Sequence, residues 1–224
     1  KNLLLNGGGK WQKDLEADGF SSGLIRNFVS CGCGEREKRP LSFNSFGYEK
    51  SNNKKTLKLE DPQALTLEQK LAIEKYKDLP SGSSLLLWGV TGSGKTEVYQ
   101  QIAAIELSAR RHCLILTPEI GLVPQLVDRF RRRFGCNVFE YHSNCSLKEK
   151  IDTWKRSLET STPSVFIGTR SAIFLPLSNL GLIVLDEEHD SSYKQESPMP
   201  CYHARDLAIH RAKKIGAKVI LGTA

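Results

Sequence analysis

The sequence lacks long apolar runs and any recognisable export signal. No apolar stretch approaches the roughly 20 residues that a membrane-spanning helix requires. The apolar start at residues 3–5 is followed at once by Asn6 and three glycines, which makes it too short for a signal peptide. The only methionine is Met199, and the chain stops at Ala224 directly after a strand-like run. We therefore expect a fragment of a longer protein that acts in the cytoplasm, away from membranes.

Paired cysteines are lacking as well. The six cysteines of the 224 residues include no C-x-x-C pair. Because a structural zinc site needs four converging ligands, we expect no zinc site in this part of the protein. A chain of this length without an export signal is also unsuited to a disulfide framework, so reduced thiols are expected.

Acidic residues are in the minority. Lysine and arginine outnumber aspartate and glutamate by 32 to 25. A basic surplus favours polyanionic partners such as nucleic acid. Lysines that merely solvate the surface would give the same count, so the charge alone leaves both interpretations open.

Short apolar runs alternate with segments of helical period from residue 65 onward. The expected strands are 83–88, 113–116, 138–141, 165–167, 182–185 and 219–221. The expected helices are 96–108, one that opens at Pro124, one capped by Ser146 with Glu149, and 203–215, which stops at Gly216. Apolar strands separated by helices indicate an α/β fold with a parallel sheet covered on both faces.

Three of these helices carry apolar stripes at helical spacing. The stripes are Val98, Ile102 and Ile105; Leu126, Phe130 and Phe134; and Leu147, Ile151, Trp154 and Leu158. Side chains three or four positions apart share one face of a helix, so we expect each stripe to point one way.

The first 60 residues have a different pattern. Residues 11–18 and 21–29 read as two short helices, and residues 36–46 as a basic hairpin. This outline is compatible with a partial winged-helix domain that contacts DNA, and equally with a small spacer that contacts protein. Residues 47–63 are polar and are typical of a linker. We therefore expect residues 1–60 to form a winged-helix-like domain and linker, and 61–224 to form the main domain.

One segment matches the phosphate-binding pattern G-x-x-x-x-G-K-[ST] in full. Its residues are Gly89, Val90, Thr91, Gly92, Ser93, Gly94, Lys95 and Thr96. It follows a predicted strand and opens a predicted helix, which is the context that the pattern requires. Backbone N–H groups of such a loop surround phosphate oxygens, while Lys95 reaches the β- and γ-phosphates and the Thr96 hydroxyl binds Mg²⁺. The segment predicts an ATP site.

An acidic cluster follows the predicted strand 182–185. Asp186 and Glu187 stand at its end, where the carboxyl edge of a parallel sheet binds ligands. We expect Asp186 to hold Mg²⁺ through water and Glu187 to polarise the water that attacks the γ-phosphate. Together with Lys95, these two carboxylates predict nucleotide hydrolysis.

The motifs resemble those of superfamily 2 helicases, and of the primosomal replication-restart DNA helicase family in particular. The matching segments are 117–122 (TPEIGL), 168–172 (GTRSA), 186–195 (DEEHDSSYKQ) and 202–207 (YHARDL). The resemblance is close over residues 64–224 and loose before them. It implies that 61–224 is the first RecA-like motor lobe, truncated at its C-terminal end. It also implies a DEAH-box 3′-to-5′ DNA helicase that uses ATP and Mg²⁺ to restart stalled replication forks.

The same resemblance implies several residue roles. Gln69 would lie near the adenine. The residues expected to contact single-stranded DNA or to couple it to hydrolysis are Thr117, Gly168, Thr169, Arg170, Tyr193, Lys194, Tyr202 and Arg205. Pro198 to Cys201 depart from the usual family pattern, where an aromatic or arginine precedes the YHAR segment. The family's zinc and its second lobe belong to parts of the protein outside this chain.

The implied partners are single-stranded and forked DNA, primosome proteins and single-strand-binding protein, in the bacterial nucleoid. Two other interpretations remain compatible with the residues. One is a different superfamily 2 DNA translocase with the same chemistry, and the other is a non-catalytic DNA-binding module derived from a truncated gene.

Overall fold

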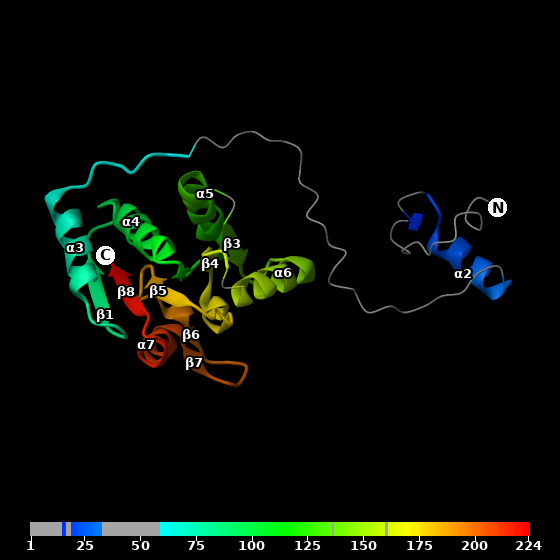
Figure 1. Ribbon diagram of the computed structural model, residues 1–224. Coiled ribbons are helices and arrows are strands. Elements are labelled where there is room, and N and C mark those ends of the chain that lie inside the picture. The colour runs from blue at the N-terminus through cyan, green and yellow to red at the C-terminus, as the bar shows by residue number, and fades with distance from the viewer. Residues whose placement is uncertain (1–14, 17–18, 33–58, 136, 160) are drawn as a thin grey trace. The chain divides into compact units, whose positions relative to one another are not determined.

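The computed structural model describes residues 15–16, 19–32, 59–135, 137–159 and 161–224. The chain divides into two compact units, Lys1–Lys54 and Lys55–Ala224 (Figure 1). In the first unit, helix α2 spans Ser22–Ser30, and the Ser21 hydroxyl accepts a hydrogen bond from the Leu24 amide at 3.3 Å. The predicted helix 21–29 is thus present. Of the predicted helix 11–18 only Leu15 and Glu16 are described, and both are helical, whereas the predicted hairpin 36–46 lies outside the described residues.

The second unit is built on a six-stranded sheet in which every strand pairs with its neighbours in parallel. The strand order is β1-β8-β5-β2-β4-β3. The strands are β1 (Ser84–Trp88), β2 (His112–Leu116), β3 (Val138–Tyr141), β4 (Val165–Gly168), β5 (Leu180–Leu185) and β8 (Lys218–Thr223). All six predicted strands are present, and the α/β fold with a parallel sheet is confirmed.

Three helices cover one face of the sheet. They are α3 (Leu67–Asp78), α4 (Lys95–Ser108) and α5 (Val123–Phe134). Their apolar residues form one continuous core with Cys113, Ile115, Ile167 and Val184 of the central strands. The predicted stripes on α4 and α5 face this core, where Val98, Ile102, Leu126 and Phe130 are buried.

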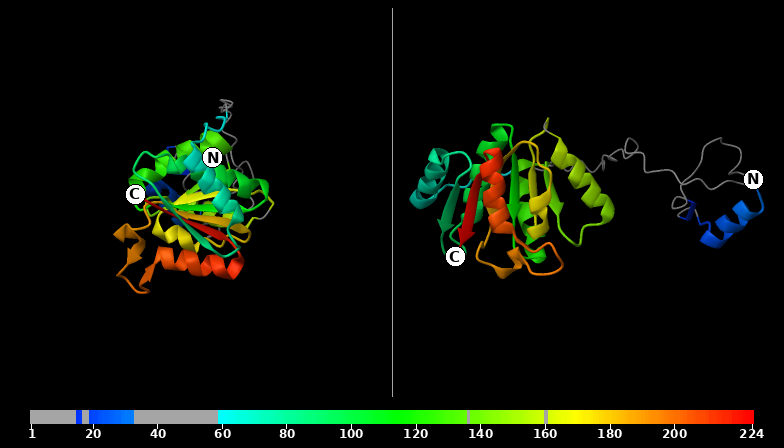
Figure 2. Two further views of the ribbon diagram at one scale, coloured as in Figure 1. Left: turned by 90° about the vertical axis from the view of Figure 1, so that its left-hand side faces the viewer. Right: turned by 90° about the horizontal axis from the view of Figure 1, so that it is seen from below.

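The opposite face is covered by α7 (Ala204–Ile215) and by the 3-10 helix η2 (Arg170–Phe174), as Figure 2 shows from two further directions. The buried residues of α7 are three alanines, whose small side chains let the helix approach the strands closely. Two further 3-10 turns, η1 (Ile120–Leu122) and η3 (Ser191–Tyr193), and a hairpin of β6 (Lys194–Gln195) and β7 (Tyr202–His203) extend the loops. Within the described ranges, no helix is long and apolar enough to cross a bilayer.

Helix ends are set by local hydrogen bonds. Both α3 and α6 (Leu147–Leu158) begin with a reciprocal capping box, formed by Thr66 with Gln69 and by Ser146 with Glu149. These contacts satisfy backbone N–H groups that the start of a helix leaves without a partner. Helix α7 ends at Gly216, which has a φ of 75° that a side chain would disfavour. The predicted cap of α6 and the predicted stop at Gly216 are both confirmed.

The apolar stripe of α6 points away from the core. Leu147 is 75% exposed, Trp154 is 42% exposed and Leu158 is also exposed. The helix instead buries Thr153 and Ser157, and the Thr153 hydroxyl donates to the Glu140 carbonyl at 3.2 Å. A polar hydrogen bond to β3 therefore orients α6, and the apolar side faces outward.

Strand β1 lies at one edge of the sheet and buries only one of its faces. Leu85 and Leu87 pack against the core under α3 and α4, while Leu86 and Trp88 alternate to the other side. Trp88 is 79% exposed, although it directly precedes the phosphate-binding segment.

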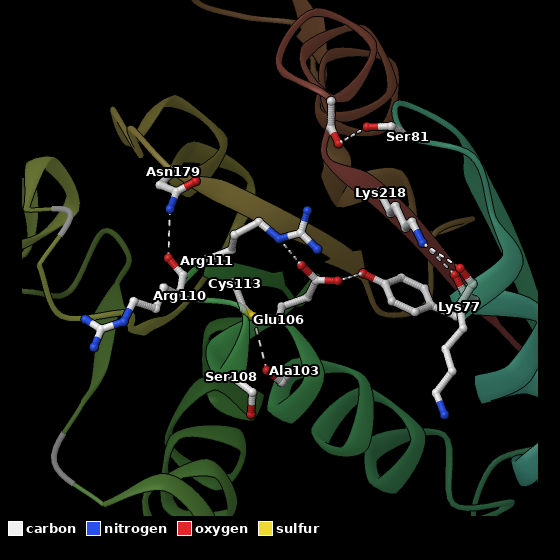
Figure 3. A network of polar contacts seen from close by, with 12 residues as sticks. Lys77, Ser81, Ala103, Glu106, Ser108, Arg110, Arg111, Cys113, Asn179 and Lys218 are labelled. Atoms are coloured by element: carbon white, nitrogen blue, oxygen red, sulfur yellow. Dashed lines mark hydrogen bonds and ion pairs between the residues drawn. The ribbon is translucent and has the colours of Figure 1, made fainter.

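A polar network ties the helices together at the amino-terminal edge of the sheet (Figure 3). Glu106 is buried, accepts a hydrogen bond from the Tyr76 hydroxyl at 2.8 Å and pairs with Arg111 at 2.7 Å. Lys218 donates to the carbonyls of Tyr76 and Lys77. The network joins α3, α4 and β8 at the end of the strands opposite to the phosphate-binding segment.

Candidate nucleotide-binding site

The loops after β1, β2, β4 and β5 meet at the carboxyl edge of the sheet, beside the end of β8. Hydrogen bonds from these loops to the ends of neighbouring strands hold the edge together. Gly89 N–H donates to the Thr223 carbonyl at 3.1 Å, Asp186 N–H to the Leu116 carbonyl at 2.9 Å, and Glu188 N–H to the Gly222 carbonyl at 2.8 Å. Parallel strands thus bring the phosphate-binding segment and the acidic cluster into one place, although about 90 residues separate them.

The phosphate-binding segment has the backbone that its glycines predict. Gly92 and Gly94 have φ values of 82° and 83°, a region that glycine adopts without steric cost. Gly94 is the N-cap of α4, so the segment leads directly into the amino-terminal end of that helix. The positive end of a helix dipole favours an anion at this position. Val90 and Thr91 are exposed beside it.

Lys95 is the first residue of α4, and its side chain turns back toward the segment. It is 9% exposed, and its Nζ donates to the Gly89 carbonyl at 2.6 Å and lies 3.4 Å from Glu187 Oε1. The ammonium group therefore joins the phosphate-binding segment to the acidic cluster.

Asp186 is held by two buried tyrosines. The Tyr99 hydroxyl of α4 donates to Asp186 Oδ1 at 3.0 Å, and the Tyr193 hydroxyl donates to the Asp186 carbonyl at 2.7 Å. Burial raises the pKa of the Asp186 carboxyl, while the Tyr99 hydrogen bond and the nearby Lys95 lower it. Burial and the Asp186 charge raise the pKa of Tyr99, which keeps this hydroxyl protonated and able to donate.

The three residues that follow Asp186 make separate contacts. Glu187 has a φ of 48°, an unusual value for a residue with a side chain, which costs about 1 kcal/mol or more. Glu188 pairs with Arg205 of α7 at 3.1 Å. His189 Nδ1 shares a hydrogen bond of 2.9 Å with the Thr223 hydroxyl of β8. The acidic cluster is thus connected to α4, α7 and β8 at once.

Gln69 contacts the phosphate-binding segment from α3. Its amide oxygen accepts from Thr66 N–H at 3.0 Å, as part of the capping box, and its Nε2 donates to the Ser93 carbonyl at 3.0 Å. The residue predicted to lie near the adenine therefore sits beside the phosphate-binding segment.

A polar cavity of about 870 Å³ opens at this edge. Lys95, Thr96, Asp186 and Glu187 line it together with residues of α5 and of the segment that precedes α3. Hydroxyl and carboxylate oxygens are the ligands that Mg²⁺ prefers, and one buried ammonium group suits a phosphate chain. The residues present fit a magnesium nucleotide in size and in chemistry.

The match to known proteins decides the family. Residues 66–224 match the family described as DEAD/DEAH box helicase. The chain belongs to the DEAD/DEAH box helicases. In this family's terms, the α/β unit is a helicase lobe in which the phosphate-binding segment and the first two residues of the D-E-E-H sequence line one cavity.

Curated helicase relatives extend the match beyond that domain. The replication restart protein PriA of Synechocystis sp. is 46% identical over 227 aligned residues, covering 99% of this chain and 26% of the relative. The PriA protein of Bacillus subtilis is 46% identical over 173 residues, covering 76% of this chain and 21% of the relative. The chain therefore spans about a quarter of the length of these relatives.

Solved helicase structures share the fold. RecG bound to a three-way DNA junction is similar with a TM-score of 0.55 and 24% identity, over 72% of this chain and 21% of that protein. The helicase domain of Hef from Pyrococcus furiosus is similar with a TM-score of 0.53 and 25% identity, over 71% of this chain and 33% of that protein.

Several residues predicted to contact DNA are engaged inside the helicase lobe. Tyr193 is completely buried, so its ring is not available to stack on a base in this structure, and its role in coupling DNA to hydrolysis stays a prediction. Thr117 is also completely buried, and Gly168 is buried at a point where a side chain would collide with the Tyr141 carbonyl. Arg205 pairs with Glu188. Tyr193, Thr117 and Gly168 therefore lie within the loops, whereas the Arg205 side chain is 38% exposed.

The remaining predicted residues lie at the surface beside the β6–β7 hairpin. Arg170 donates to the Lys194 carbonyl at 2.6 Å, and its guanidinium lies over the Tyr202 ring at 5.7 Å. Thr169 is half-buried, and the Lys194 side chain is exposed and pairs with Glu196. Phe174, which the sequence argument did not single out, is half exposed and packs edge-on against Tyr202 at 4.9 Å.

Sequence reasoning also missed Tyr99. The available signal was its spacing, because Tyr99 stands four residues after Lys95 and so shares a helix face with it.

Proposed function

We propose that this chain is the nucleotide-binding motor lobe of a DNA helicase that moves 3′ to 5′ and restarts stalled replication forks. The observation that carries the proposal is the meeting of Lys95 with Asp186 and Glu187 at one cavity. The 46% identity to replication restart proteins over nearly the whole chain supports the choice of pathway.

Each residue at the cavity would have a distinct task. The amides of residues 91–94 and Lys95 would bind the phosphates of ATP, and Thr96 with Asp186 would hold Mg²⁺, which neutralises phosphate charge. Glu187 would orient and polarise the attacking water. Since Lys95 pairs with Glu187 in this structure, a bound γ-phosphate would compete for the ammonium group and free the carboxylate. Gln69 would sense the base through its contact with Ser93.

Single-stranded DNA would pass over the loops that follow β2 and β4. Exposed Phe174 and Lys194, with half-buried Tyr202, offer aromatic rings and a cation at that surface. Aromatic rings of this kind stack on bases and cations neutralise phosphates. Arg170, which holds Lys194 and Tyr202, would transmit DNA binding to the segment after Asp186.

The whole protein would act on forked DNA with primosome proteins and single-strand-binding protein, in the nucleoid. Its zinc and its second lobe would be supplied by regions beyond this chain. A winged-helix domain in residues 1–60 would give a further DNA contact.

The test is the ATPase rate of the full gene product, measured with and without forked DNA. We expect DNA to stimulate the rate and Lys95→Ala to abolish ATP binding, since the cavity loses its buried cation. Lys214→Ala, which removes an exposed lysine of α7, is the matched control and should behave as the parent. If Lys95→Ala bound ATP as tightly as the parent, the assignment of the nucleotide site would be overturned.

A further inference from the structure

Helix α4 presents two polar groups toward the acidic cluster. Lys95 and Tyr99 are four residues apart and therefore lie on one face of the helix. Lys95 reaches Glu187, and Tyr99 reaches the neighbouring Asp186 at 3.0 Å. Consecutive carboxylates at the end of β5 are thus each contacted from the same helix.

The Tyr99 hydroxyl is placed where an apolar residue would otherwise fit. Tyr99 is completely buried in the core formed with Val98 and Ile102. A buried hydroxyl without a hydrogen bond is costly, so the bond to Asp186 is needed to offset its burial. Phenylalanine would fill the same space and leave the carboxylate without this donor.

The end of β8 makes room for this contact. A side chain at Gly222 would collide with the Tyr99 hydroxyl and would approach Asp186 Oδ1 at 3.4 Å. Gly222 also accepts from Glu188 N–H, and the next residue, Thr223, contacts His189. The glycine is therefore required by the close approach of α4, the acidic cluster and β8.

Tyr76 provides an internal comparison. It is buried in the same core, and its hydroxyl donates to Glu106 at 2.8 Å. Both tyrosines thus bond a carboxylate within one core, but only the carboxylate partner of Tyr99 lines the cavity.

We propose that Tyr99 is a positioning residue that fixes the Asp186 carboxylate for magnesium binding and ties its orientation to the position of β8. The proposal rests on the nucleotide site described above. Residues that hold a metal ligand from behind typically change metal affinity by about 10- to 100-fold when they are removed. Tyr99 would affect only the part of nucleotide binding that depends on Mg²⁺. The phosphate-binding segment and Lys95 would bind the phosphates without it.

The experiment titrates MgCl₂ into the chain with a fluorescent ADP analogue, and measures affinity in EDTA separately. For Tyr99→Phe we expect affinity in EDTA within about twofold of the parent and a Mg²⁺ midpoint raised by about 10-fold. Tyr76→Phe removes an equivalent buried hydroxyl and should leave the Mg²⁺ midpoint unchanged. Urea unfolding of both variants checks that each is folded.

The outcomes separate this inference from the nucleotide site itself. Two results would overturn the role of Tyr99 but keep the nucleotide site, provided that Lys95→Ala still loses ADP binding. One is a Mg²⁺ midpoint in Tyr99→Phe within twofold of that of the parent. The other is an equal shift of the midpoint in Tyr76→Phe. Retained ADP binding in Lys95→Ala would overturn the site as a whole. If Tyr99→Phe does not fold, Gly222→Ala is the second variant, because its added methyl group displaces the Tyr99 hydroxyl while the tyrosine is kept. An unchanged Mg²⁺ midpoint in Gly222→Ala would also overturn the role of Tyr99.

Discussion

At the scale of single residues, the contact between Lys95 and Glu187 has two effects on the site. At 3.4 Å the pair neutralises a buried ammonium group, and it also keeps the predicted catalytic carboxylate occupied. Nucleotide binding must therefore replace one anionic partner of Lys95 with another. The energetic gain on binding is smaller than a free lysine would provide.

Glu187→Gln tests this competition. We expect turnover to fall by about 100-fold or more, because a neutral amide cannot polarise water as a carboxylate does. Nucleotide affinity should be equal to that of the parent or higher, because Lys95 loses its anionic competitor. The measurement is the ATPase rate of the full gene product beside ADP-analogue binding. Turnover at the parent rate would assign the role to another residue.

The phosphate-binding segment could be predicted from residues that lie close together along the chain. The eight residues of the phosphate-binding segment act through their own backbone, so their pattern contains most of the information needed. The surroundings of Tyr193 and Arg205 could not be predicted, because they depend on partners that only the folded loops bring near. Arg205 meets Glu188 across 17 positions, and Arg170 meets Lys194 across 24. No pattern of neighbouring residues in the sequence predicts such pairs.

At the scale of elements, one residue at the start of α3 both stabilises the helix and contacts the nucleotide site. Gln69 caps the helix with one end of its amide and contacts Ser93 with the other. The helix escaped prediction because only Ile73 and Tyr76 are buried, which leaves a weak apolar pattern. Its start was nevertheless marked in the sequence by Thr66 and Gln69 at capping-box spacing.

Thr66→Ala and Gln69→Ala should separate the two roles of this helix start. Loss of the Thr66 hydroxyl is expected to lower the free energy of unfolding by about 1 kcal/mol and to leave ADP affinity unchanged. Gln69→Ala removes the contact to Ser93 as well and should weaken ADP binding. Urea unfolding followed by circular dichroism and ADP-analogue titration are the two measurements. Equal ADP affinities in both variants would contradict the assignment.

In helix α6, the apolar periodicity predicts the helix but not the direction in which its apolar face points. Its apolar spacing correctly predicted a helix, and its capping box correctly predicted the first residue. The direction of the stripe could not be read from the sequence, because the face that α6 buries carries Thr153 and Ser157, and Thr153 bonds to β3.

At the scale of the whole molecule, stability and nucleotide chemistry lie at opposite ends of the strands. The network of Glu106, Arg111 and Tyr76 closes the amino-terminal edge, and the cavity opens at the carboxyl edge. The alternation of strands and helices predicted the layers of this sheet. It did not predict that β8, the last strand, lies between β1 and β5.

Glu106→Gln should therefore affect folding alone. We expect the free energy of unfolding to fall by about 1–2 kcal/mol, because a buried charged hydrogen bond is weakened while partly exposed Arg111 regains water. ADP affinity of the folded chain should equal that of the parent. A lowered ADP affinity with an unchanged urea midpoint would show that the two edges are coupled.

The described tryptophans, Trp88 and Trp154, both reach the surface. Their indole rings already meet water in the native state, so their emission should peak at long wavelength before any denaturant is added. Unfolding of the α/β unit would then change their emission spectra little. The buried tyrosines of α3 and α4 are the better optical reporters of its unfolding.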